Sequence, residues 1–182
     1  MTPSPGNIYL SGMIGSGKTT LGLHLAEALD LPLYDVDREM DRRLGYSFHR
    51  LVAERGWVAF RELEYAICKD FVRLNRALVC LGGGTVRYEW NRDLLRGTGL
   101  VILLTAPVAE LARRVRLAER PRVNAGTTLE QDLEKIWAES ADTYRRAADL
   151  IYSTAEKEVE EAVSDLTPTL RAFLNTGSIH GT

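Results

Sequence analysis

Residues 12–19 read Gly12-Met13-Ile14-Gly15-Ser16-Gly17-Lys18-Thr19 and satisfy the pattern GxxxxGK[ST]. In this pattern the glycines allow backbone N–H groups to converge on phosphate oxygens. A short β-prone run from Ile8 to Leu10 precedes the stretch, and a helical pattern with Leu21, Leu25 and Leu29 on one face follows it. The order of strand, glycine loop and helix predicts a phosphate-binding loop at a helix N-terminus.

The rest of the chain alternates short apolar runs with segments of helical spacing. Because the runs are apolar throughout, they predict strands buried on both faces, as in a parallel sheet covered by helices. The expected fold class is therefore α/β, a three-layer sandwich around a five-stranded parallel sheet. Besides Ile8 to Leu10, the expected strands are Leu31 to Tyr34, Ala77 to Leu81, Leu100 to Leu104 and Leu150 to Tyr152.

Helices are expected over the intervening segments. A short helix contains Met40 and Leu44 and ends at Gly45, and a capping box of Thr128 and Gln131 opens another. The remaining helical patterns comprise a short one around Phe48 to Val52, a longer one from about Trp57 to Leu74, one from Val108 to Val115 and one from Val159 to Phe173.

A chain of 182 residues, with 45% apolar and 26% charged residues, has the size and composition of one globular domain. No repeat or linker divides it, so residues 1–182 are expected to form a single domain. Within it, the arginine-rich and apolar-poor segment 116–126 predicts a mobile lid, and residues 175–182 a polar tail.

The formal charge of −2 gives no global positive field for a polyanion, which argues against a nucleic-acid partner. No apolar run approaches the length of a membrane span, and the N-terminus has no signal-peptide pattern, so a cytoplasmic protein is expected. Cys68 and Cys80 are expected to be reduced core thiols. His24, His49 and His180 lack ligand or triad spacing and are interpreted as structural or solvated.

The glycine loop indicates a bound nucleotide with Mg²⁺, and the pattern alone does not separate kinases from GTPases, ATPases or nucleotide-driven switches. Lys18 is expected to reach the β- and γ-phosphates, Thr19 to ligate Mg²⁺ and Thr20 to donate on the α-phosphate side. The other nucleotide-binding positions of the loop are Gly12, Gly15, Ser16 and Gly17.

Two further features lie outside the loop. Asp37, at the end of the second strand, is placed to orient an alcohol toward the γ-phosphate and to accept its proton. Arg61 is a guanidinium on an otherwise amphipathic helix and has the geometry to bind a carboxylate. Glu64, three residues on, either fixes the Arg61 rotamer or forms an ordinary exposed pair with it.

Taken in order, the blocks GMIGSGKTT, YDVD, FRELE, LGGGT and ERP resemble the shikimate kinases, and the resemblance runs from about Ile8 to Glu161. It implies a P-loop fold like that of the nucleoside-monophosphate kinases, a monomer, and ATP-dependent phosphorylation of shikimate to shikimate 3-phosphate in aromatic amino-acid biosynthesis. A small molecule is the implied partner.

The resemblance also implies roles for single residues. Asp35 is expected to hold Mg²⁺ through water, with a helix N-cap as the alternative interpretation. Arg61 is expected to bind the shikimate carboxylate, and Asp37 its hydroxyl. Of Gly82, Gly83 and Gly84, the middle glycine is expected to contact substrate. Arg120 is expected to close over the transferring phosphate and Arg113 to flank adenine, with a solvated basic face as the alternative for either arginine.

One segment departs from the family pattern. Where the shikimate kinases usually read RxPxY, this chain has Ser140-Ala141-Asp142-Thr143-Tyr144, so that Ser140 replaces an arginine that contacts shikimate. Two alternatives follow: a related kinase with another acceptor such as gluconate, or a non-catalytic sensor on the same scaffold. Otherwise another arginine supplies the charge, the candidates being Arg87, Arg122, Arg145 and Arg146.

Overall fold

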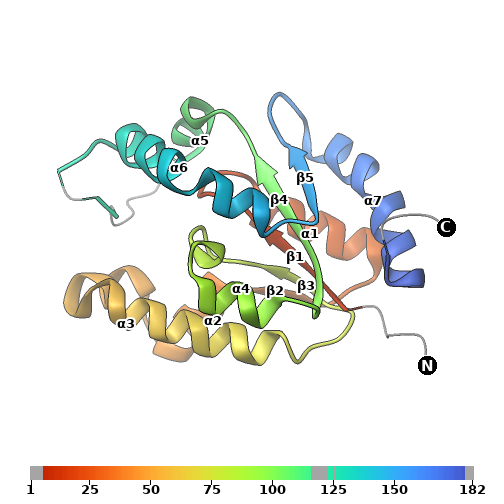
Figure 1. The fold of residues 1–182 in the computed structure, drawn as a ribbon, viewed down its shortest axis with the longest axis horizontal. Coiled ribbons are helices and arrows are strands. Elements are labelled where there is room, and N and C mark those ends of the chain that lie inside the picture. The colour runs from red at the N-terminus through yellow and green to blue at the C-terminus, as the bar shows by residue number, and fades with distance from the viewer. Residues whose placement is uncertain (1–5, 116–122, 125, 179–182) are drawn as a thin grey trace.

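A computed structural model of the chain describes residues 6–115, 123–124 and 126–178 (Figure 1). Its centre is one parallel sheet in the order β2-β3-β1-β4-β5, which confirms the predicted α/β fold with five parallel strands. The strands are β1 (Asn7–Ser11), β2 (Leu33–Asp35), β3 (Leu78–Cys80), β4 (Gly99–Thr105) and β5 (Leu150–Ser153).

Helices cover both faces of this sheet (Figure 1). The apolar residues of α1 and α7 form one core with one face, and those of α2, α3, α5 and α6 form a second core with the other. The helices are α1 (Lys18–Leu29), α2 (Val36–Leu44), α3 (Phe48–Phe71), α4 (Glu89–Leu95), α5 (Val108–Val115), α6 (Leu129–Arg146) and α7 (Val159–Thr176).

Strand β1 shows why the strands are apolar throughout. Ile8 and Leu10 belong to the core under α1 and α7, whereas Tyr9 between them belongs to the opposite core, and all three are fully buried. Successive side chains of a strand point to opposite faces, and here both faces are covered. The central position of β1 places the glycine loop that follows it at the middle of the sheet's carboxyl edge.

The element bounds differ from the expected ones in a few places. Strand β2 begins at Leu33 instead of Leu31, and α3 ends at Phe71 instead of Leu74. The predicted break between two helical segments is present inside α3, at Gly56, where φ is 77° and ψ is 179°. Two short elements were not predicted: α4 and the 3₁₀ turn η1 (Thr85–Arg87).

Helix α7 continues to Thr176, two residues into the segment predicted to be a polar tail, and Gly177 is its C-cap. Of the predicted lid, only Val123, Asn124 and Gly126 fall within the described residues. No helix in the described part of the chain is both long and apolar enough to span a bilayer.

The cysteines and histidines largely follow their interpretation. Cys68 and Cys80 are buried and form no disulfide, and burial raises the pKa of the Cys80 thiol to about 12. His24 is exposed, His49 is partly buried, and His180 lies outside the described residues.

Candidate active site

The glycine loop between β1 and α1 has the form of a phosphate cradle. A Cβ atom at Gly12 would lie 2.4 Å from the carbonyl oxygen of Leu104, and one at Gly15 would lie 2.7 Å from that of Leu111, so neither position has room for a side chain. Gly17 is the N-cap of α1, and no side chain caps this end of the helix. The first N–H groups of α1 are therefore left for an anion.

Two polar side chains complete the loop. The Lys18 Nζ donates to the carbonyl oxygens of Gly12 at 2.8 Å and Met13 at 2.9 Å, which holds its positive charge over the loop. The Ser16 Oγ is buried without a hydrogen-bond partner among the described residues. Lys18, Thr19 and Thr20 line a cavity of about 440 Å³ beside the loop, so the loop residues fit a bound nucleotide phosphate.

Thr19 and Asp35 place a hydroxyl and a carboxylate side by side at this cavity. The Thr19 Oγ1 donates to Asp35 Oδ2 at 2.9 Å. The other carboxylate oxygen of Asp35 accepts from the backbone N–H groups of Asp37 at 3.0 Å and Arg38 at 3.1 Å. Asp35 is therefore the N-cap of α2, as the alternative interpretation held, and it also faces Thr19.

A hydroxyl and a carboxylate are hard oxygen donors of the kind that Mg²⁺ prefers. Within the described ranges, no group of three or more His, Cys, Asp or Glu residues is placed to hold a metal. Two protein oxygens beside a phosphate cradle fit Mg²⁺ that completes its coordination with phosphate oxygens and water.

A second cavity lies next to the first and contains Arg61. The Arg61 Nη1 donates to Glu64 Oε2 at 2.7 Å, and the guanidinium lies over the rings of Phe60 and Tyr88, 4.7 and 4.6 Å from their centroids. The Arg61 side chain is 12% exposed and that of Glu64 is 0% exposed. The interpretation of an exposed surface pair is therefore wrong, because this pair is buried.

Glu64 is held by polar groups on two sides. Besides Arg61, it accepts from Thr85 Oγ1 at 2.7 Å and from Asn91 Nδ2 at 3.4 Å. The position of Arg61 against the cavity is thus fixed by η1 and α4 as well as by its own helix. The Arg61 Nε is buried without a hydrogen-bond partner in the described part of the chain.

The three glycines after β3 let other groups approach the backbone. A Cβ atom at Gly82 would lie 2.8 Å from Glu64 Oε1, and one at Gly84 would lie 2.9 Å from Arg61 Nη2. Gly83 is closest to Ile14 of the glycine loop, and its carbonyl oxygen accepts from the Tyr144 hydroxyl at 2.5 Å. Gly83 and Gly84 line the second cavity, whereas Gly82 makes room for Glu64 behind it.

Asp37 lies where the two cavities meet. It lines both of them, as do Ile14 and Gly83. Its Oδ1 would lie 3.4 Å from a Cβ atom at Gly82. A carboxylate at this junction can contact a hydroxyl group held beside Arg61 while facing a phosphate held by the loop.

Of the two arginines expected near the nucleotide, only Arg113 belongs to the described residues. Arg113 is exposed on α5 and does not line the cavity beside the loop, and Arg120 lies outside the described residues. The neighbouring Arg114 does line that cavity, donating to the Gly15 carbonyl oxygen at 3.2 Å and to Thr154 Oγ1 at 3.0 Å. Helical spacing from the buried Leu111 is the signal that could have favoured Arg114, because i and i+3 share a face.

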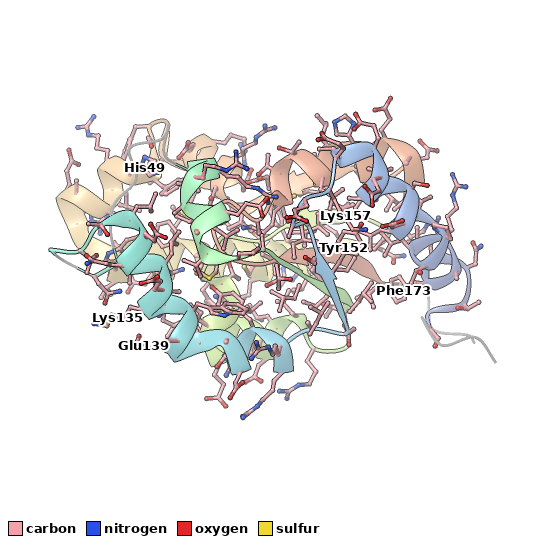
Figure 2. All side chains as sticks on the ribbon, turned by 90° about the horizontal axis from the view of Figure 1, so that it is seen from above. His49, Lys135, Glu139, Tyr152, Lys157 and Phe173 are labelled. Carbon is pink, nitrogen blue, oxygen red and sulfur yellow. The ribbon has the colours of Figure 1, made fainter. Side chains whose placement is uncertain are left out.

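Sequence reasoning also missed two residues at the cavity walls. Lys157 lines the rim of the nucleotide cavity, next to Tyr152 in Figure 2, and its hydrogen bond to Asp165 at 2.6 Å raises its pKa. His49, labelled on α3 in the same figure, lines the second cavity and packs edge-on against Phe48. Neither residue lies in a motif, so no local pattern marks it.

Known proteins resemble this chain over most of its length. The family model described as "Shikimate kinase" matches residues 14–171. A shikimate kinase from Nitrosomonas europaea is 36% identical over 168 residues, which are 92% of this chain and 79% of that protein. One from Nitrosococcus oceani is also 36% identical, over 92% of this chain and 88% of its own.

A solved structure agrees with these matches. The structure of shikimate kinase from Acinetobacter baumannii in complex with shikimate is 28% identical, with a TM-score of 0.86, and covers 93% of this chain and 94% of its own. A phosphate cradle, a Thr–Asp oxygen pair and an arginine-lined second cavity therefore occur in a chain that also matches one family over most of its length. This chain belongs to the shikimate kinase family.

Proposed function

We propose that this protein transfers the γ-phosphoryl group of ATP to a hydroxyl group of shikimate, forming shikimate 3-phosphate and ADP in aromatic amino-acid biosynthesis. The observation that carries the proposal is the position of Asp37, Ile14 and Gly83, which line both the cavity of the phosphate loop and the cavity of Arg61. Donor and acceptor held in these two cavities would share Asp37 at their boundary.

The reaction is a displacement at phosphorus. The acceptor oxygen forms a bond to the γ-phosphorus, the bond from that phosphorus to the β–γ bridging oxygen breaks, and ADP leaves with the electron pair. Asp37 orients the hydroxyl and accepts its proton as the new bond forms. Its position at the junction of the cavities supports this role.

The phosphate loop supplies positive charge and hydrogen-bond donors. Lys18 turns from the carbonyl oxygens of Gly12 and Met13 to the β- and γ-phosphates, and the N–H groups at the start of α1 donate to phosphate oxygens. Thr19 and Asp35, whose oxygens lie 2.9 Å apart at this cavity, would hold Mg²⁺, Asp35 through water by the family pattern. Mg²⁺ bound there would offset the negative charge of the phosphates.

The acceptor is bound by the second cavity. Arg61, fixed by Glu64, binds the carboxylate of shikimate, and the backbone at Gly83 and Gly84 contacts its ring. By the family pattern, Arg120 stabilises the transferring phosphoryl group and an arginine of α5 flanks adenine. The pattern points to Arg113, whereas Arg114 is the arginine of α5 that lines the nucleotide cavity. Because one chain supplies both cavities, we propose that it acts as a monomer, in the cytoplasm where ATP is available.

ADP release by the purified protein with Mg²⁺-ATP tests the proposal, with shikimate, gluconate or no acceptor added. Turnover that depends on shikimate and not on gluconate is the expected result. Stimulation by gluconate alone would reassign the acceptor. ATP binding without stimulation by either acid would favour a nucleotide sensor.

A further inference from the structure

Arg87 lies at the wall of the second cavity, named the acceptor cavity from here on, and on a different element from Arg61. It is the last residue of η1, the turn that follows the three glycines, and its side chain is partly buried. Its Nε donates to the Ser140 Oγ of α6 at 3.0 Å. Ser140 is itself only 6% exposed, so η1 and α6 meet here in a buried contact. The cavity thus has a guanidinium on two of its sides.

The two guanidinium groups differ in how their charge is balanced. Arg61 is paired with Glu64 at 2.7 Å. Within residues 6–115, 123–124 and 126–178, Arg87 has no carboxylate partner, and the bond to Ser140 engages its Nε alone. A guanidinium has five N–H donors in a planar fork, so the terminal nitrogens of Arg87 remain for a ligand.

The carboxylates at the same cavity do not balance Arg87. Asp132 is 4% exposed and accepts from the backbone N–H groups of Val123 at 3.1 Å and Asn124 at 2.8 Å. Asp37 lies at the boundary with the nucleotide cavity. The cavity therefore has an excess of positive charge on the side of Arg87, which suits an anion.

Arg87, Arg61 and Tyr144 all line the same cavity. Burial raises the pKa of Tyr144, and the positive charges of Arg87 and Arg61 oppose that rise. Tyr144 lies one turn after Ser140 on α6 and donates to the Gly83 carbonyl oxygen. Arg87, Arg61 and Gly83 thus belong to the lining of one cavity, with Tyr144 bonded to Gly83 among them.

The other arginines that could replace the charge missing at position 140 are less well placed. Arg145 is exposed, lies over the Trp137 ring and is paired with Asp142 at 3.4 Å. Arg146 is exposed and lines a different cavity with Arg92. Arg122 lies outside the described residues.

We propose that Arg87 binds the acceptor carboxylate together with Arg61, and that Ser140 positions Arg87 for this task. The proposal rests on the proposed function, because it names a residue of the same acceptor site. The small Ser140 side chain leaves the space that Arg87 occupies, so the positive charge enters the cavity from η1 and not from α6. Ser140 is then a positioning residue, and its difference from the family pattern preserves the chemistry of the site.

The first test is Arg87→Gln, which removes the charge but keeps most of the length. We expect the KM for shikimate to rise by about 10- to 150-fold, the effect of losing a hydrogen bond to a charged group. The kcat and the KM for ATP should stay within a few-fold, because Arg87 lies outside the nucleotide cavity. Arg146→Gln is the matched control and should leave all three constants unchanged.

A substrate without the negative charge separates binding from folding. With the methyl ester of shikimate, wild type and Arg87→Gln should have nearly the same KM, because no carboxylate is present for Arg87 to bind. An equal rise in KM for shikimate and for its ester would mean that the variant merely distorts the cavity, and would overturn the proposal.

Placing an arginine at position 140 of α6, as in the family pattern, gives a second, independent test. In the double variant Arg87→Ala with Ser140→Arg, the KM for shikimate should return most of the way to the wild-type value. Ser140→Arg alone should bring no improvement, because Arg87 already occupies the space. Ser140→Ala should raise that KM by about 2- to 10-fold with kcat unchanged, and Ser140→Thr should restore it.

The failures of the two proposals are distinguishable. If the wild-type protein shows no turnover with shikimate, the proposed function fails and this assignment fails with it. If wild type turns shikimate over and Arg87→Gln has an unchanged KM, only the assignment to Arg87 is overturned. If Arg87→Gln does not fold, the double variant Arg87→Ala with Ser140→Arg decides. A KM for shikimate that stays high in that variant overturns the assignment.

Discussion

At the scale of single residues, the Glu64 carboxylate holds the guanidinium that faces the acceptor. Its three partners, Arg61, Thr85 and Asn91, come from α3, η1 and the start of α4. Because the Glu64 carboxylate is held by this network, it fixes the position of the Arg61 guanidinium. The network needs all of its partners, because an unpaired buried charge costs stability.

Glu64→Ala should therefore destabilise the protein strongly. It leaves the nearly buried Arg61 without its counterion, and breaking a buried pair in this way lowers the free energy of unfolding by about 3–5 kcal/mol. Urea unfolding measures the change. The control is Glu54→Ala, which breaks the exposed pair with Arg50 and should leave the midpoint unchanged. Equal midpoints for the two variants would contradict a structural role for Glu64.

Asp37→Asn should separate chemistry from nucleotide binding. The amide keeps the size of the side chain but cannot accept the proton, so kcat should fall by about 100-fold or more. The Kd for Mg²⁺-ATP, measured by calorimetry, should be unchanged because the proposed partner of Asp37 is the acceptor hydroxyl. The control is Asp70→Asn. Asp70 lies at the C-terminal end of α3, where it is paired with Arg43 of α2. An active Asp37→Asn enzyme would remove Asp37 from the role of base.

At the scale of elements, the parts that sequence predicted well are those fixed by local chemistry. The glycine loop, the capping box of Thr128 and Gln131 and the Gly45 helix end all occur as expected, because each depends on residues within one turn. The break at Gly56 was likewise visible as a change of helical pattern.

The parts that could not be predicted depend on contacts between distant segments. The segment Thr85 to Leu95 is held by a residue far away in the sequence, because the Glu64 carboxylate accepts from Thr85 Oγ1 at 2.7 Å and from Asn91 Nδ2 at 3.4 Å. The bond of Arg87 to Ser140 joins residues 53 positions apart. The sequence therefore predicts a set of candidates for the arginine missing at position 140. It does not predict which candidate lies in the cavity, because that depends on tertiary packing.

The kink in α3 shapes the acceptor cavity, since Phe48 and His49 lie before it and Trp57, Phe60 and Arg61 after it. Gly56 has backbone angles that only glycine adopts readily, although a Cβ atom there would meet nothing within 4 Å. Gly56→Asn should therefore lower the free energy of unfolding by about 1–3 kcal/mol through backbone strain alone.

The matched control for this prediction is Gly45→Asn. Gly45 also has open space around it, but its φ of 72° and ψ of 8° lie in the left-handed region, which asparagine tolerates. Guanidinium chloride unfolding should show a clear loss for Gly56→Asn and little change for Gly45→Asn. If both variants lose the same stability, strain at the kink is not the cause. A rise in the KM for shikimate in Gly56→Asn would show the kink acting on the cavity.

At the scale of the whole molecule, the parallel sheet brings the two cavities to one edge. The glycine loop follows β1, Asp37 follows β2 and the three glycines follow β3, and these strands are neighbours in the sheet. In open α/β sheets, ligands bind outside the carboxyl ends of the strands. The two cavities are thus lined by largely separate sets of side chains that meet at Asp37, and under the proposed function one set binds the donor and the other the acceptor.

This separation predicts independent stabilisation by the two ligands. Mg²⁺-ATP at about 100 times its Kd stabilises the folded state by about 2.7 kcal/mol, which for a chain of this size raises the unfolding midpoint by roughly 5–11 °C. Shikimate should give a shift of its own. In Lys18→Ala the nucleotide shift should shrink while the shikimate shift remains, and Arg61→Ala should show the reverse.

Differential scanning fluorimetry with each ligand alone measures these shifts in the wild type and in both variants, with EDTA added to test the contribution of Mg²⁺. EDTA should reduce the nucleotide shift and leave the shikimate shift intact, because Thr19 and Asp35 line the nucleotide cavity and not the acceptor cavity. Absence of a shift for the wild type with shikimate alone would mean that shikimate binds only after the nucleotide. The acceptor cavity would then be completed by closure over ATP, and the two sites would be coupled instead of independent.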